Sequence, residues 1–152
     1  MKIFTKSNGI CVLVLSLLAL VSACSNPGRE ATTTDKPISP PDRVDVVYFY
    51  DSDICSCQIA PGDQIQGTLF INFNGDLISG KLTYQSVDLT DQKNAAIISK
   101  YGATSQSLFI NLVRGGSERI IAMPEMLVVK DDDEALSRLI ITRIQLYLDG
   151  EE

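Results

Sequence analysis

The sequence VDVVYFYDSDICSCQ, residues 44–58, joins an apolar run to a pair of cysteines. Residues 44–50 are mainly β-branched and aromatic, a composition typical of a strand buried in a parallel sheet. A single residue, Ser56, separates Cys55 from Cys57, and the chain contains no histidine that could act as a base or a metal ligand beside them. The pattern is therefore compatible with three hypotheses for the two cysteines: a redox pair, a site for a soft metal ion, or two thiols without a chemical role.

The N-terminus has the pattern of a secretory signal. Two lysines precede an apolar run of about a dozen residues, which is shorter than the roughly 20 residues that span a bilayer. An uncleaved anchor is the alternative. Residues 21–24, VSAC, resemble the lipobox of bacterial lipoproteins. That resemblance implies that residues 1–23 are removed and that Cys24 carries lipid, which would hold the chain on the extracytoplasmic side of a membrane.

Residues 24–42 are predicted to form a flexible linker between the lipid and a single domain at residues 43–152. The linker holds four of the six prolines and very few apolar residues. Loss of residues 1–23, which contain two lysines and no acid, would change the net charge from −6 to −8. An acidic chain without a cluster of basic residues is unsuited to binding nucleic acid.

The domain alternates between strand and helix patterns. Ile65, Leu69, Phe73 and Leu77 lie on one helical face, and Gly80 is suited to end that helix. The later segments are predicted as a strand at residues 82–89, a helix at residues 91–101 ending at Gly102, a hairpin of strands at residues 107–113 and 118–123, and a helix at residues 131–148 with an acidic start. Their order is β-α-β-α-β-β-α.

This order predicts an α/β domain of three layers, with a parallel core and an antiparallel hairpin at its edge. Together with cysteines placed between the first strand and the first helix, it resembles the thioredoxin fold. The likeness is closest to small, membrane-anchored thioredoxin-like proteins of bacteria and archaea, which place a cysteine about six residues after a VYYF-type strand. Phe49 and Cys55 have this spacing.

The resemblance implies thiol–disulfide exchange with exported thiol or disulfide proteins, and it implies no cofactor. In thioredoxins a helix N-terminus lowers the pKa of the first cysteine, which attacks a disulfide, and the second cysteine resolves the mixed disulfide. By position, Cys55 would attack and Cys57 would resolve. Pro61 lies near the place where thioredoxins carry a kinking proline, although it could also be a first-turn proline.

Four features depart from the thioredoxin pattern. A disulfide across one intervening residue closes a small, strained ring, which favours an oxidising potential. Residues 103–107 contain no counterpart of the cis-proline that thioredoxins place before the third strand, and Phe49 replaces a buried aspartate. Asp51 and Asp53 are expected to raise the pKa of a nearby thiol by charge repulsion, opposing the effect of the helix.

Two other functions remain open. The domain could be a redox-inactive binding module, or it could handle Cu(I), because Met123 and Met126 add two soft thioethers to the two thiols. Core packing is the simpler explanation of the methionines. The acidic run at residues 131–134 lacks the ligand spacing of a calcium loop and is expected to begin a helix. Nothing in the pattern indicates an oligomeric state.

Overall fold

The computed structural model describes residues 39–151. The predicted signal, the predicted lipidation site Cys24 and residues 24–38 of the predicted linker lie outside the described part. Within residues 39–151, no helix is both long enough and apolar enough to cross a membrane.

Four strands form a single mixed sheet, and their order is β2-β1-β3-β4. The central strand β1 runs parallel to β2, while β3 runs antiparallel to both β1 and β4. The predicted parallel pairing of helix-linked strands is confirmed for β1 and β2, and the predicted antiparallel hairpin is confirmed as β3 and β4. The parallel pairing does not extend to β3, which follows a helix but pairs antiparallel with β1. The strands are β1 (Arg43–Tyr50), β2 (Leu82–Asp88), β3 (Ser107–Arg114) and β4 (Ser117–Ala122).

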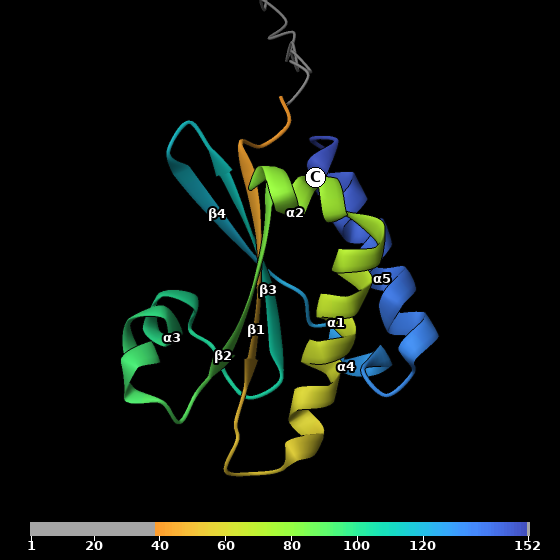
Figure 1. The fold of residues 1–152 in the computed structure, drawn as a ribbon. Coiled ribbons are helices and arrows are strands. Elements are labelled where there is room, and N and C mark those ends of the chain that lie inside the picture. Colours follow the sequence, from red (N-terminus) through yellow and green to blue (C-terminus); the bar gives the residue numbers. More distant parts are fainter. Residues whose placement is uncertain (1–38, 152) are drawn as a thin grey trace, which may run out of the picture. The chain divides into compact units, whose positions relative to one another are not determined.

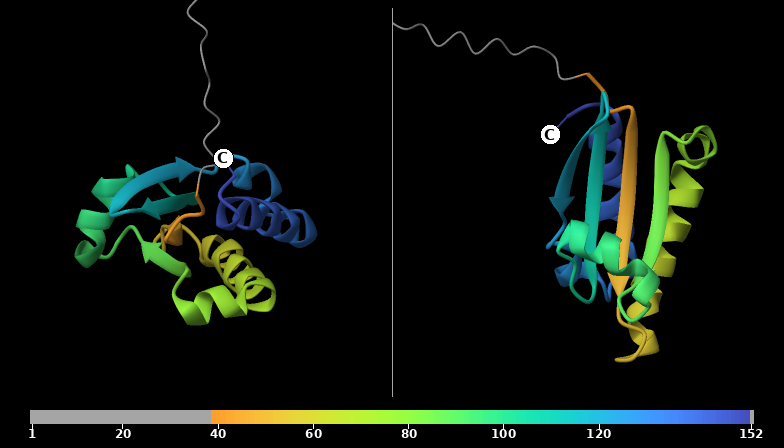
Figure 2. Two further views of the ribbon diagram at one scale, coloured as in Figure 1. Left: turned by 90° about the horizontal axis from the view of Figure 1, so that it is seen from above. Right: turned by 90° about the vertical axis from the view of Figure 1, so that its left-hand side faces the viewer.

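Helices cover both faces of the sheet, with α3 on one face and α1 and α5 on the other (Figure 1 and, from above, Figure 2). Because side chains alternate along a strand, Val46 and Tyr48 of β1 enter the core beneath α1 and α5, while Val47 and Phe49 pack beneath α3. The helices are α1 (Ile59–Asn72), α2 (Asn74–Ser79), α3 (Ala95–Tyr101), α4 (Met126–Val129) and α5 (Asp133–Leu148), with 3₁₀ turns η1 (Ser56–Gln58) and η2 (Gln92–Asn94).

The long helix expected before Gly80 is in fact two helices. Phe73 leaves the helical region at φ −130°, and its buried side chain lies in the core. Asn74 and Gly75, both poor helix formers, begin the separate helix α2. The predicted end is confirmed, because Gly80 caps α2 in the left-handed conformation at φ +75°. The prediction of one continuous helix was wrong because side-chain spacing does not reveal a break in the backbone.

The last residues of the predicted linker contact the domain. The Asp42 backbone N–H donates to the Val113 carbonyl at 2.8 Å, and the Asp42 carboxylate accepts from the Gly115 N–H at 2.6 Å. The Arg114 Nε donates to the Ser39 carbonyl at 3.0 Å. The chain therefore enters the sheet beside the β3–β4 turn, at the end where β1 begins.

Gly62 allows α1 to pack closely on β1, and its replacement by alanine is expected to destabilise the domain. A Cβ there would lie 2.7 Å from the Tyr48 Cδ1 and 3.2 Å from the Tyr84 hydroxyl. The fully buried Tyr48 ring has little room to move, so Gly62→Ala should lower the free energy of unfolding by about 1–3 kcal/mol. Urea denaturation measures the change. Gly67→Ala is the matched control in the same helix, because its Cβ meets nothing within 4 Å and should raise stability by up to about 1 kcal/mol.

Candidate functional site

The two cysteines lie in the turn that carries β1 into α1, at the bottom of Figure 1. They form a disulfide, with their Cα atoms 5.1 Å apart, a spacing that disulfides commonly show. Cys57 is exposed and Cys55 is partly exposed. The bond is therefore open to thiols or disulfides of another molecule.

Cys55 is the N-cap of the helical segment that follows. Its backbone is extended, and its Sγ accepts a hydrogen bond from the Cys57 backbone N–H at 3.0 Å. The turn η1 continues directly into α1, so the sulfur lies at the positive end of a helix of several turns. Pro61 is the third residue of α1, where a missing N–H breaks no intrahelical hydrogen bond. It therefore belongs to the first turn and does not kink the helix.

The side chain of Gln58 holds the cysteine turn to its surroundings. It is only 5% exposed, and its Oε1 accepts from the Asp51 backbone N–H at 3.0 Å and from the Ser105 hydroxyl. The Gln58 carbonyl accepts from the Tyr48 hydroxyl at 2.6 Å. Sequence reasoning missed Gln58. Its position directly after Cys57 was the available signal.

A tight turn before β3 lies beside the cysteines, in the segment where thioredoxins carry the cis-proline. Ser105 joins this turn to Gln58, and the Ser107 hydroxyl donates to the Thr104 carbonyl at 2.6 Å. Gln106 has φ +57°, a conformation uncommon outside glycine. The segment thus has a defined shape without a proline.

An aromatic cluster surrounds Phe49, the position where the resemblance would place a buried aspartate. Phe49 is fully buried, and its ring centroid lies 5.5 Å from that of Tyr101 and 5.7 Å from that of Phe109. Asp51 remains near the turn, where its carboxylate accepts from the Asp53 N–H at 3.0 Å. Phe49 therefore contributes packing and cannot exchange a proton.

Apolar side chains and a groove surround the cysteine end of the sheet. Ile54 and Ile59, on either side of the cysteines, are exposed. Because Ser107 pairs with Phe49, the start of β3 lies at this same end. A groove of about 230 Å³ opens there between the turn before β3 and α4, with Leu127 on its wall. The surface beside the disulfide can thus contact apolar parts of a protein.

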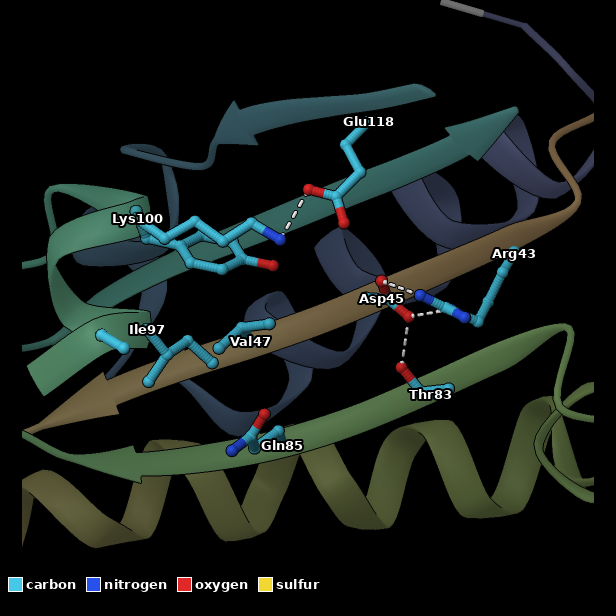
Figure 3. A pocket seen from close by; sticks show the side chains of 10 residues that line it. Arg43, Asp45, Val47, Thr83, Gln85, Ile97, Lys100 and Glu118 are labelled. Atoms are coloured by element: carbon cyan, nitrogen blue, oxygen red, sulfur yellow. Dashed lines mark hydrogen bonds and ion pairs between the residues drawn. The ribbon is translucent and has the colours of Figure 1, made fainter. Parts of the chain in front are cut away.

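A second, larger pocket of about 530 Å³ lies on the α3 face of the sheet (Figure 3). The short helix α3 leaves this part of the face open. Four charged side chains line the pocket as two ion pairs, Arg43 with Asp45 at 2.6 Å and Lys100 with Glu118 at 2.5 Å. Because each charge faces an opposite one, the lining carries no net charge.

Asp45 stays ionised in this pocket. Burial raises the pKa of Asp45, but hydrogen bonds from Arg43, Thr83 and Asn111 outweigh that effect and hold the pKa below its usual range. Asp45 accordingly joins β1 to β2 and β3 by polar contacts across an uncovered face.

Met123 and Met126 are buried in the core, as the packing interpretation predicts. Within the described range 39–151, no three or more acidic, cysteine or histidine side chains are grouped so that they could hold a metal ion. The acidic run begins α5, where the Asp132 carboxylate accepts from the Ala135 N–H at 2.9 Å. Core packing therefore explains the two methionines, and helix capping explains the acidic run.

No protein-family model matches the sequence, and a search of curated proteins finds no match. Among solved structures, the chain is similar to the solution structure of a thioredoxin from Thermus thermophilus, with 14% sequence identity and a TM-score of 0.37. The match covers 66% of this chain and 75% of that one. With the strand order β2-β1-β3-β4, an antiparallel third strand and helices on both faces, the described domain has a thioredoxin-like fold.

Proposed function

We propose that this protein carries out thiol–disulfide exchange with exported proteins through Cys55 and Cys57. The observation that supports this most directly is the hydrogen bond from the Cys57 N–H to the Cys55 Sγ in an exposed disulfide at a helix start. A thiolate at Cys55 would be stabilised by the same N–H group and by the helix dipole. Cys55 is therefore the attacking sulfur and Cys57 the resolving one.

The exchange needs only the two sulfurs and the substrate. In the reductive direction, the Cys55 thiolate attacks a substrate disulfide, forms a mixed disulfide and releases one substrate thiolate. The Cys57 thiolate then attacks the Cys55 sulfur, which re-forms the Cys55–Cys57 disulfide and releases the second substrate sulfur. The substrate gains two electrons, the cysteine pair loses two, and the oxidative direction reverses these steps.

Protein substrates suit the surface around the disulfide. Ile54, Ile59 and Leu127 are exposed at this end, and Leu127 lines the groove before β3. Exposed apolar side chains around a reactive centre favour contact with apolar segments, which incompletely folded proteins display. Exported proteins forming their disulfides are substrates of this kind.

The proposed site of action is the outer surface of a cytoplasmic membrane or the periplasm. Support comes from the signal pattern of residues 1–23 and the lipobox-like sequence that ends at Cys24. An oxidising compartment is where disulfides form and persist. Lipid on Cys24 would also leave Cys55 and Cys57 as the only thiols of the mature chain.

Alkylation followed by mass spectrometry tests the proposal. A chain beginning at residue 25 contains only Cys55 and Cys57. We expect both thiols to be alkylated after reduction, neither after incubation with oxidised glutathione, and this change to be reversible. Brief alkylation of the reduced chain at neutral pH should modify Cys55 before Cys57, because only the Cys55 Sγ faces a backbone N–H donor. Two thiols that never form an intramolecular disulfide would instead indicate a redox-inactive binding module.

A further inference from the structure

Large apolar side chains are exposed at both ends of the domain. One group surrounds the disulfide. The other consists of Phe70 and Ile71 near the end of α1 and Ile78 in α2, which are 64%, 79% and 78% exposed. We call these three residues the α1–α2 patch. It takes no part in the core, because α1 faces the sheet through Ile65 and Leu69.

The α1–α2 patch lies at the end of the domain where the chain enters. The starts of β1 and β2 are adjacent, since Val44 pairs with Leu82, and α2 immediately precedes β2. Figure 1 shows α2 and the start of β1 together at one end, with the cysteine turn at the other. The described chain begins here at Ser39, and 38 residues precede it.

We propose that the α1–α2 patch rests on the surface of a lipid bilayer, and this inference relies on the proposed lipid anchor at Cys24. Because Ser39 and Asp42 are held by the domain, about 14 residues (25–38) remain between it and Cys24, and as a coil they would reach on the order of 20 Å. An anchor at Cys24 would thus keep this end of the domain close to the membrane. Such tethering gives an effective concentration on the order of millimolar, so a weak contact suffices.

The patch suits a lipid surface better than a second copy of the chain. A stable protein interface buries about 800 Å² on each partner, a larger area than three side chains provide. Apolar side chains at a bilayer surface enter the boundary of the headgroups without needing a matching partner shape. Residues 67–82, the segment that carries the patch, contain one acid, Asp76, and one base, Lys81, and so have no net charge of their own.

Docking at this end would orient the reactive site. The strand β1 has eight residues and spans about 26 Å. With the α1–α2 patch on the bilayer, the disulfide at the far end of β1 faces away from the membrane, toward soluble exported proteins.

The chain contains no tryptophan, which makes a fluorescence test specific. The lipidated full chain carrying Phe70→Trp is placed in phosphatidylcholine vesicles with brominated acyl chains, which quench tryptophan on contact. The control is Val128→Trp in α4, because Val128 is 86% exposed and α4 follows β4 at the cysteine end. We expect the brominated lipid to quench about half or more of the emission of Phe70→Trp, because a docked side chain would lie about 5–10 Å into the boundary between headgroups and acyl chains. The emission of Val128→Trp should not be quenched.

A second variant checks that the patch causes the contact. Adding Ile71→Ser and Ile78→Ser to Phe70→Trp changes only exposed side chains, and it should abolish the quenching while the chain stays attached to the vesicles. Equal emission with and without bromine in Phe70→Trp would overturn the docking. Unquenched, blue-shifted emission would also overturn it, because it would place another copy of the protein over the patch.

Vesicle flotation, bromine quenching and alkylation test the lipid anchor, the docking and the redox proposal separately. A chain that does not float with vesicles would refute the anchor and with it the docking. A chain that floats but shows no quenching would refute the docking alone. The redox proposal is decided by alkylation of Cys55 and Cys57, on which vesicle binding has no bearing.

Discussion

Replacing Cys55 by serine is expected to reduce thiol–disulfide exchange to the rate of buffer alone, whereas replacing Cys57 should trap substrates. Cys55 is the sulfur that faces the Cys57 N–H at the helix start, and without it no stabilised thiolate remains. In Cys57→Ser, the Cys55 thiolate still attacks a disulfide, but no second sulfur resolves the product. Mixed disulfides with substrate proteins should therefore accumulate in Cys57→Ser only.

Non-reducing electrophoresis of the two variants, after mixing with an oxidised, partly unfolded protein, measures this difference. Ser56→Ala is the control, because it leaves both sulfurs and the Cys57 N–H in place. Equal trapping by Cys55→Ser and Cys57→Ser would contradict the assignment of separate roles. Absence of adducts in both would favour a module that binds without chemistry.

The second large effect is a loss of stability at alkaline pH, caused by two tyrosines that lie beneath the start of α1. The Tyr48 hydroxyl donates to the Gln58 carbonyl, and the Tyr84 hydroxyl donates to the Gly62 carbonyl at 2.7 Å. Burial raises the pKa of Tyr48 well above its usual value, with a further contribution from Tyr84, and burial raises the pKa of Tyr84 to about 12. An unfolded tyrosine has a pKa of about 10.

Stability should therefore be fully present below pH 10 and should fall as the pH rises toward the folded pKa values. In that range the unfolded chain releases protons that the folded domain retains, so each tyrosine lowers the free energy of unfolding by up to about 1.4 kcal/mol per pH unit. Urea titrations at pH 8, 10 and 11 should show a loss of about 2 kcal/mol between the last two from Tyr48 and Tyr84 together. Deprotonation also removes both hydrogen bonds that hold the start of α1.

Tyr84→Phe provides the control for this titration. The variant is less stable at pH 8, because the Gly62 carbonyl loses its donor, but its stability should fall less steeply above pH 10. A slope identical to that of the unmodified protein would contradict the role assigned to Tyr84. An unchanged stability up to pH 11 in the unmodified protein would contradict the burial of both hydroxyls.

The order of elements could be predicted from the sequence because it depends on local patterns. A few neighbouring residues are enough to predict β1 from its apolar run and the ends of α2 and α3 from their glycines. Gly80 and Gly102 end their helices, as predicted, and both adopt the left-handed conformation that favours glycine. The helix between β1 and β2 correctly indicated a parallel pair. The helix between β2 and β3 did not reveal that β3 pairs antiparallel with β1, because a connection does not fix which strand its end pairs with.

Other features could not be predicted because they depend on contacts between distant segments. Gln58 meets Ser105 across 47 positions of the chain, and no local pattern marks that pairing. The charged pocket exists because α3 is too short to cover its face of the sheet, which depends on how the helix lies. Asp45 is a charged residue within an apolar strand, and nothing in the strand itself explains it. The structure does, because Thr83 and Asn111 on the neighbouring strands donate hydrogen bonds to its carboxylate.

The reduction potential of the Cys55–Cys57 pair tests the central claim most directly. Equilibration of the chain from residue 25 onward in glutathione buffers, with quenching and mass spectrometry, measures it. We predict a reversible two-electron couple above about −220 mV, because a ring with one intervening residue is strained and the Cys57 N–H stabilises the reduced Cys55 thiolate. A pair that forms no intramolecular disulfide at any glutathione ratio would contradict the account.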